Sequence, residues 1–141
     1  MGSLDLSDLP EGALVLLDSA PIIYILDQDP RHAPRFRPLF ERQGAGEIRF
    51  AVTSMTIAEV LTGPLKAGEE ALARRYRAVM ESWQVVNLTP DIAESAARFR
   101  ARLGLKMADA VQAASAIAIN ADALVTHDRD FSRVRTLKVL R

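Results

Sequence analysis

Short apolar runs alternate with helix-like segments along almost the whole chain, and this alternation limits the possible folds more than any other feature. The first run, Ala-Leu-Val-Leu-Leu at residues 13–17, is apolar at every position, as in strands that are buried on both faces. Strands that alternate with helices pair mainly in parallel, and the helices cover both faces of the sheet. We therefore predict an α/β fold with a mainly parallel sheet of four to five strands. The expected strands are 13–17, 48–53, 84–88, 123–126 and 137–140.

The segments between these strands carry the signals of helices. Ser19 is a candidate N-cap, and Gly63-Pro64 is expected to end the third helix. The helix at 107–119 is apolar around its whole circumference, which is typical of a buried helix. We predict one domain over residues 13–141, preceded by a flexible tail at 1–12. The helices are expected near 19–29, 34–43, 54–63, 67–83, 89–103 and 107–119.

The amino-acid composition excludes several classes of protein function. Lys plus Arg equals Asp plus Glu at 18 each, so the chain does not attract nucleic acid by net charge, and any such binding must use local basic patches. The absence of cysteine excludes disulfides, iron–sulfur clusters and thiolate zinc sites. No apolar stretch is long enough to cross a bilayer, and Asp5, Asp8 and Glu11 do not fit a signal peptide. We expect a cytoplasmic protein that does not bind membranes.

Four carboxylates occupy places that a parallel sheet would bring together. Asp18 and Asp128 directly follow predicted strands, Glu59 lies early in the helix after the second strand, and Asp109 lies in the first turn of the buried helix. In an α/β sheet, the carboxyl ends of the strands form the edge where ligands bind. We therefore expect these four side chains to meet at that edge.

Each carboxylate also has a purely structural explanation. Asp18 could cap the helix that follows it, and Glu59 completes a Thr-x-x-Glu capping box. Asp109 is favoured by the helix dipole, while Asp128 and Asp130 are common turn residues. Together, however, two carboxylates about 4 Å apart would repel each other by on the order of 4 kcal/mol at an effective dielectric near 20. A cation between them would relieve this repulsion, and oxygen ligands favour Mg²⁺ or Mn²⁺.

Four segments of the sequence carry the residues discussed above and together cover most of the chain. They are Val-Leu-Leu-Asp-Ser-Ala (15–20), Thr-Ser-Met-Thr-Ile-Ala-Glu-Val (53–60), Met-Ala-Asp-Ala-Val-Gln-Ala-Ala-Ser-Ala (107–116) and Ala-Leu-Val-Thr-His-Asp-Arg-Asp-Phe (123–131). In their order and spacing, these segments resemble the PIN domain family, and more narrowly its VapC-type toxins of type II toxin–antitoxin systems. The resemblance implies a three-layer α/β/α fold, a metal-dependent endoribonuclease that uses Mg²⁺ or Mn²⁺, a cognate antitoxin and a homodimer.

The resemblance also implies roles for single residues. The family's four acidic positions match, in chain order, Asp18, Glu59, Asp109 and Asp128. Ser19 matches the hydroxyl position after the first acid, and Thr126 matches the hydroxyl residue before the last one. Where the family often has a further Ser or Thr, this chain has Ala20 and Pro21. Asp130 could support or replace Asp128.

These matches lead to a hypothesis for the reaction. Asp18 and Asp109 would be the principal metal ligands, with Glu59 and Asp128 acting through water or a second ion, and activated water would hydrolyse the RNA phosphodiester. The nearest candidate phosphate contacts are Arg129, Arg133 and Arg135, which could equally form a solvated, charge-balanced turn. The alternative function is a catalytically inactive PIN-like module that binds RNA or protein.

Overall fold

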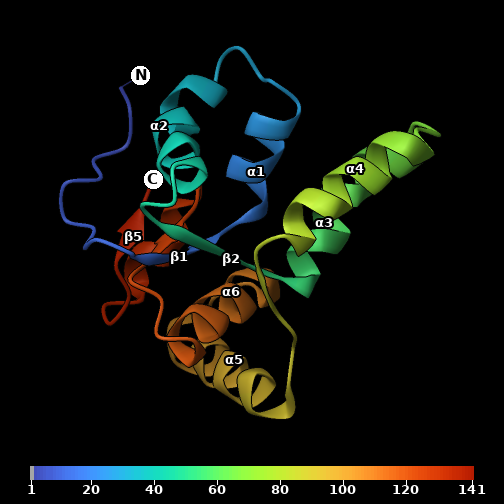
Figure 1. Cartoon of the computed structure of the whole chain (residues 1–141). Coiled ribbons are helices and arrows are strands. Elements are labelled where there is room, and N and C mark those ends of the chain that lie inside the picture. Colours follow the sequence, from blue (N-terminus) through green and yellow to red (C-terminus); the bar gives the residue numbers. More distant parts are fainter. Residues whose placement is uncertain (1) are drawn as a thin grey trace.

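In a computed structural model, which describes residues 2–141, the chain folds around one sheet of five strands (Figure 1). The spatial order is β3-β2-β1-β4-β5, and every neighbouring pair is parallel. The predicted α/β class is confirmed. The strands are β1 (Leu14–Leu17), β2 (Arg49–Thr53), β3 (Gln84–Val86), β4 (Ala123–Val125) and β5 (Val139–Leu140).

Helices cover both faces of the sheet, which gives the expected three layers (Figure 1). On one face lie α1 (Ser19–Leu26) and α2 (Ala33–Gly44). On the opposite face lie α5 (Pro90–Leu103) and α6 (Met107–Ala118). A further pair, α3 (Ser54–Lys66) and α4 (Glu70–Glu81), packs against α1 and extends away from the sheet (Figure 1). A short 3₁₀ helix, η1 (Arg129–Arg133), follows β4.

The central strand β1 separates two apolar cores. Val15 and Leu17 point into the core beneath α1 and α2, whereas Leu14 and Leu16 point into the core beneath α5 and α6. Leu16 and Leu17 are completely buried. Full burial of a leucine side chain stabilises a fold by about 1.5–3 kcal/mol. The continuous apolar run in the sequence therefore reflects burial on both sides.

The strand order creates a crevice at the carboxyl end of β1. From β1 the chain winds through β2 to β3, and α5 and α6 then carry it back across the sheet to β4 on the other side of β1. Ligand sites in open α/β sheets form where the winding reverses in this way. Leu17 pairs with Val125, so residues 18 and 126 leave the sheet side by side.

Two helix ends differ from the prediction. Helix α3 continues through Pro64 to Lys66, so the proline lies inside the helix instead of ending it and leaves one intrahelical hydrogen bond unmade. The helix stops where Gly68 adopts a φ of +74° and donates to the Leu65 carbonyl at 3.1 Å. Helix α1 ends at Leu26, earlier than expected, and the Tyr76 hydroxyl donates to the Leu26 carbonyl at 3.0 Å.

The amino-terminal segment forms no helix or strand between residues 2 and 12, and Met1 lies outside the described residues. Leu4 and Leu9 are buried in the core near α2, and the Leu4 amide donates to the Arg35 carbonyl at 3.2 Å. The flexibility of this tail stays a prediction. Among the helices of residues 2–141, none combines the length and apolarity that a bilayer crossing needs.

Candidate metal centre

Asp18 stands at the carboxyl end of β1 and is held by three hydrogen bonds. It caps α1, and its Oδ1 accepts from the Ser19 amide at 2.9 Å. The same oxygen accepts from Nε2 of Gln112 at 2.9 Å, and Oδ2 accepts from the Thr126 hydroxyl at 2.8 Å. Asp18 therefore does cap the helix that follows it, as its structural explanation predicted. Oδ1 accepts two hydrogen bonds and Oδ2 accepts one, so the lone pair available to a ligand is on Oδ2.

Gln112 was not among the predicted site residues, although it links three elements beneath the crevice. Its Nε2 donates to the Thr56 hydroxyl at 2.7 Å as well as to Asp18, and its Oε1 accepts from the Thr53 hydroxyl at 3.0 Å. Gln112 is 1% exposed. A buried amide is stable only when it is fully hydrogen-bonded. The sequence signal was a lone Gln in an apolar helix, one turn after Asp109.

Asp109, Asp128 and Asp130 bring one carboxylate oxygen each within 4.8 Å of one another. Asp109 comes from the first turn of α6, and Asp128 follows β4. The Asp128 amide donates to Thr126 Oγ1 at 3.0 Å, and Oδ1 of Asp128 accepts from the Asp130 amide at 2.8 Å. Asp128 therefore also stabilises the turn in which it lies, as its structural explanation predicted. Thr126 connects Asp18 to Asp128 and fixes their relative position.

Asp109 is the electrostatically strained member of the group. Its side chain is 8% exposed, and within residues 2–141 its buried Oδ2 has no hydrogen-bond partner. Burial raises the pKa of Asp109 to about 6, and the negative charges of Asp128 and Asp18 act in the same direction. A buried carboxylate oxygen without a donor, facing other carboxylates, has the environment that a cation would stabilise.

Glu59 completes the set at the mouth of the crevice. It is exposed at the surface of α3, and partial desolvation and the charge of Asp18 raise its pKa. All four predicted carboxylates line one open hollow of about 610 Å³, together with Ser19. The four carboxylates therefore face the same hollow, whereas the group with oxygens within 4.8 Å of one another consists of Asp109, Asp128 and Asp130. This donor set is made of oxygens alone, which suits Mg²⁺ or Mn²⁺.

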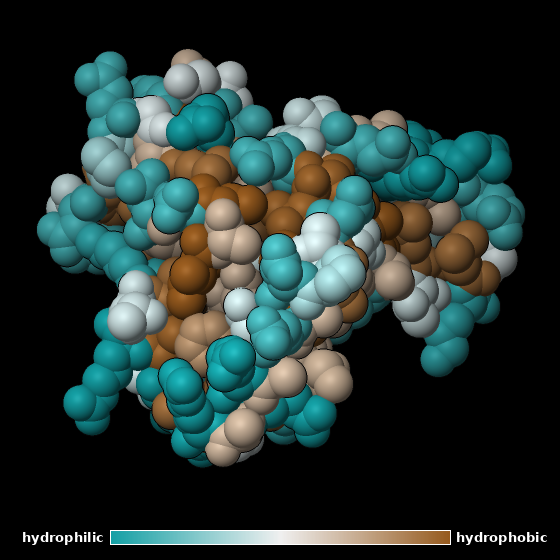
Figure 2. Space-filling view, turned by 90° about the horizontal axis from the view of Figure 1, so that it is seen from below, coloured by the Kyte–Doolittle hydropathy of each residue, from teal (hydrophilic) through white to brown (hydrophobic). Residues whose placement is uncertain are grey.

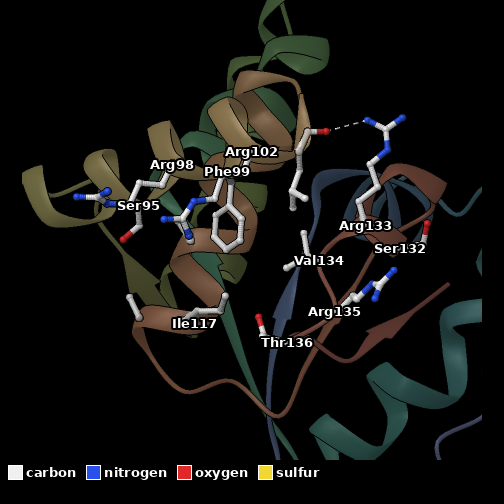
Figure 3. Close-up of a pocket in the computed structure, with 13 residues that line it drawn as sticks. Ser95, Arg98, Phe99, Arg102, Ile117, Ser132, Arg133, Val134, Arg135 and Thr136 are labelled. Carbon is white, nitrogen blue, oxygen red and sulfur yellow. Dashed lines mark hydrogen bonds between the residues drawn. The ribbon is translucent and has the colours of Figure 1, made fainter.

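The three predicted phosphate-binding arginines separate in the structure. Arg129 lines the acidic hollow beside His127 and also borders a second hollow that contains Arg35. Arg133 donates to the Leu103 carbonyl at 3.1 Å and, with Arg135, lines a groove between α5, α6 and residues 132–136 (Figure 3). Only Arg129 of the three borders the carboxylates. The intervening turn of η1 directs the other two elsewhere.

The comparisons with known proteins agree with this architecture. The family model of the PIN domain matches residues 15–137. A toxin–antitoxin complex from Klebsiella pneumoniae has 27% identity and a TM-score of 0.67, covering 84% of this chain and 90% of that chain. VapBC2 from Rickettsia felis, bound to a DNA fragment from its promoter, has 20% identity and a TM-score of 0.70, covering 89% and 96%.

A third similar structure is VapC20 from Mycobacterium tuberculosis, a toxin that cleaves the sarcin–ricin loop, with 18% identity and a TM-score of 0.68 over 85% of this chain and 94% of that chain. Among curated proteins, none matches the sequence. The family model spans most of the chain, and the similar structures share its fold over nearly their whole length. The resemblance seen in the sequence is therefore confirmed: the chain belongs to the PIN domain family.

Proposed function

We propose that this chain is the toxin of a toxin–antitoxin pair and that it hydrolyses RNA with the help of Mg²⁺ or Mn²⁺. The observation that carries the proposal is the buried Oδ2 of Asp109, which lacks a donor within residues 2–141 and lies among acidic side chains. A fold that only needed structural carboxylates would supply donors to that atom. The complete acidic set also favours a nuclease over an inactive binding module.

Each carboxylate has its own role in the proposal. Asp18 and Asp109 are the principal ligands, because hydrogen bonds orient Asp18 and no hydrogen bond occupies Oδ2 of Asp109. Glu59 and Asp128 act through water or hold a second ion. When bound, a divalent cation supplies Lewis acidity that activates water and offsets charge on the phosphate. In-line hydrolysis leaves a 5′-phosphate and a 3′-hydroxyl, and Arg129 is placed to contact substrate phosphate.

The partners follow from the similar structures, several of which contain a toxin together with its antitoxin. We propose a cognate antitoxin, a homodimer and a cytoplasmic location. Leu65 on α3 is 46% exposed and Val79 on α4 is 37% exposed, so this helix pair offers apolar surface for an interface. Light scattering of the isolated protein, with and without a Val79→Asp substitution, tests whether α4 takes part in dimerisation.

The test of the nuclease is cleavage of a mixed RNA pool followed by sequencing of both fragment ends. We expect cleavage with Mn²⁺ or Mg²⁺, none with a chelator, and none from Asp18→Asn or Asp109→Asn. The matched control is Asp91→Asn, because Asp91 lies in the first turn of α5, as Asp109 does in α6, but is exposed, whereas Asp109 is buried. RNA binding without metal-dependent cleavage would contradict the proposal and favour the inactive module.

A further inference from the structure

A groove of about 980 Å³ lies between α5, α6 and residues 132–136, outside the acidic hollow (Figure 3). One wall carries Phe99 and Arg102 of α5, and the facing wall carries Val134 and Arg135. The apolar lining includes Phe99, which is only partly buried. On the side where α5 and α6 lie, hydrophobic surface is bordered by hydrophilic side chains (Figure 2). The groove is therefore open to a ligand with both apolar and charged parts.

The charge of the groove has one sign. It is lined by Arg98, Arg102, Arg133 and Arg135, and none of its lining residues within 2–141 is acidic. Two of these arginines are engaged, since Arg98 lies 3.6 Å from Glu94 and Arg133 donates to a backbone carbonyl. In the described part of the chain, Arg102 and Arg135 form no side-chain hydrogen bond or ion pair (Figure 3). In a chain of zero net charge, the groove is therefore a local concentration of positive charge.

Two elements, α6 and η1, run from the acidic centre to the groove. Asp109 is in the first turn of α6 and Ile117, which lines the groove, is eight residues later, about 12 Å along the helix axis. Asp128 caps η1, and the last residue of η1, Arg133, lines the groove. A nucleic-acid strand bound at the carboxylates could thus reach the groove within a few nucleotides.

We propose that this groove binds an unpaired stretch of RNA that flanks the cleaved bond, with phosphates on Arg102 and Arg135 and a base against Phe99. The inference rests on the proposed function, because it assigns an RNA strand to the acidic centre. Single-stranded nucleic acid is held by cationic grooves with aromatic side chains on which bases stack, and this groove combines both. A peptide of acidic residues alone would pair with the arginines but would offer no ring to stack on the partly buried Phe99.

The test measures binding of a fluorescent oligoribonucleotide of about 12 nucleotides, within the range of known single-strand sites, by anisotropy. The full chain is used with a chelator, so that no cleavage occurs and binding is read independently of the nuclease. The test variant is Arg102→Gln with Arg135→Gln. The matched control is Arg74→Gln with Arg75→Gln, which removes two exposed arginines of α4.

Loss of two phosphate contacts lowers the slope of log K against log salt by about 1.4, which is roughly a 25-fold loss of affinity near 0.1 M salt. The control should keep the wild-type slope. Phe99→Leu keeps the apolar packing but removes the stacking surface, and we expect about a fivefold loss or more. Thermal unfolding will show whether the double arginine variant folds. If that variant does not fold, Phe99→Leu alone tests the groove.

Equal slopes for the test variant and the wild type, with Phe99→Leu binding normally, would overturn the proposal. The proposal would also be overturned, in favour of a protein partner, if an oligoglutamate peptide displaced the RNA. For that outcome the peptide must bind the wild type at least as tightly as RNA does and must bind the Arg102→Gln, Arg135→Gln variant more weakly. Groove binding without any metal-dependent cleavage would refute the proposed nuclease while leaving the groove assignment intact. Metal-dependent cleavage without RNA binding in the groove would refute the groove assignment while leaving the proposed nuclease intact.

Discussion

Replacing Asp109 with Asn should stabilise the metal-free protein, although it should abolish cleavage. The substitution keeps the shape of the side chain and removes a negative charge that is buried beside Asp128 and Asp18. The amide of Asn can donate hydrogen bonds to the neighbouring carboxylates, whereas the ionised Asp cannot. The variant therefore tests directly whether the acidic centre is under electrostatic strain.

The magnitude follows from the raised pKa. In the folded state the pKa of Asp109 is about 6, against an ordinary value of 3.8. A tenfold change in proton affinity corresponds to about 1.4 kcal/mol, so ionised Asp109 destabilises the fold by about 3 kcal/mol. Well below pH 3.8 the side chain is neutral in both states and the penalty is absent. It grows as the pH rises from 3.8 to about 6 and is complete above that.

The assay is urea unfolding of wild type and Asp109→Asn with a chelator, at pH 8 and near pH 4.5. We expect the variant to be more stable by up to about 3 kcal/mol at pH 8, which corresponds to a rise in Tm of about 10 °C for a domain of this size. Near pH 4.5 the gain should fall to about 1 kcal/mol. Comparing the two proteins at each pH cancels the titration of the groups they share.

Asp91→Asn is the control, because it removes a first-turn carboxylate that is exposed. It should lose a few tenths of a kcal/mol to about 1 kcal/mol through the helix dipole. If Asp109→Asn is no more stable than wild type at pH 8, or gains equally at both pH values, the carboxylates are not repelling one another. The electrostatic argument for a cation site would then fail.

Three further predictions concern the supports of the site and the helix that carries Glu59. Gln112→Leu should destabilise the fold by about 1–3 kcal/mol in urea unfolding, because Thr53 and Thr56 lose their buried partner; an unchanged midpoint would contradict the network. Thr126→Val, which is nearly isosteric, should lower the cleavage rate with little change in substrate affinity, since the hydroxyl orients Asp18, and a normal rate would refute this. Pro64→Ala should raise Tm by restoring a helical N–H, and a lower Tm would show that the proline fits α3 better than alanine does.

Local sequence rules predicted that Asp18 and Asp128 lie at one edge of the sheet, because each comes shortly after an apolar strand. Asp18 follows β1 and Asp128 lies three residues after β4, and the pairing of those strands sets the two side by side. Their chemical roles remain proposals. Parallel α/β topology needs only the order of strands and helices, and for this reason the layers were predictable from the sequence.

Contacts between distant elements were not predictable in the same way. The side chain of Gln112 forms hydrogen bonds with Thr53, Thr56 and Asp18, which come from other parts of the chain. No local rule predicts such partners for a glutamine in an apolar helix. Likewise, the spacing of Arg129, Arg133 and Arg135 did not show that η1 would turn the chain toward α5. The continuation of α3 past Pro64 and the early end of α1 at Leu26 likewise did not follow from local helix signals.

The position of β4 beside β1 has a consequence for synthesis of the protein on the ribosome. Thr126 and Asp128 are made more than a hundred residues after Asp18, and they reach it only when β4 pairs with the strand made first. Contacts at such sequence separation form late, after the intervening chain has been closed into a loop. An unfinished chain that ends before residue 123 lacks the second half of the acidic centre. Under the proposed function, such an unfinished chain would not yet cleave the messenger that encodes it.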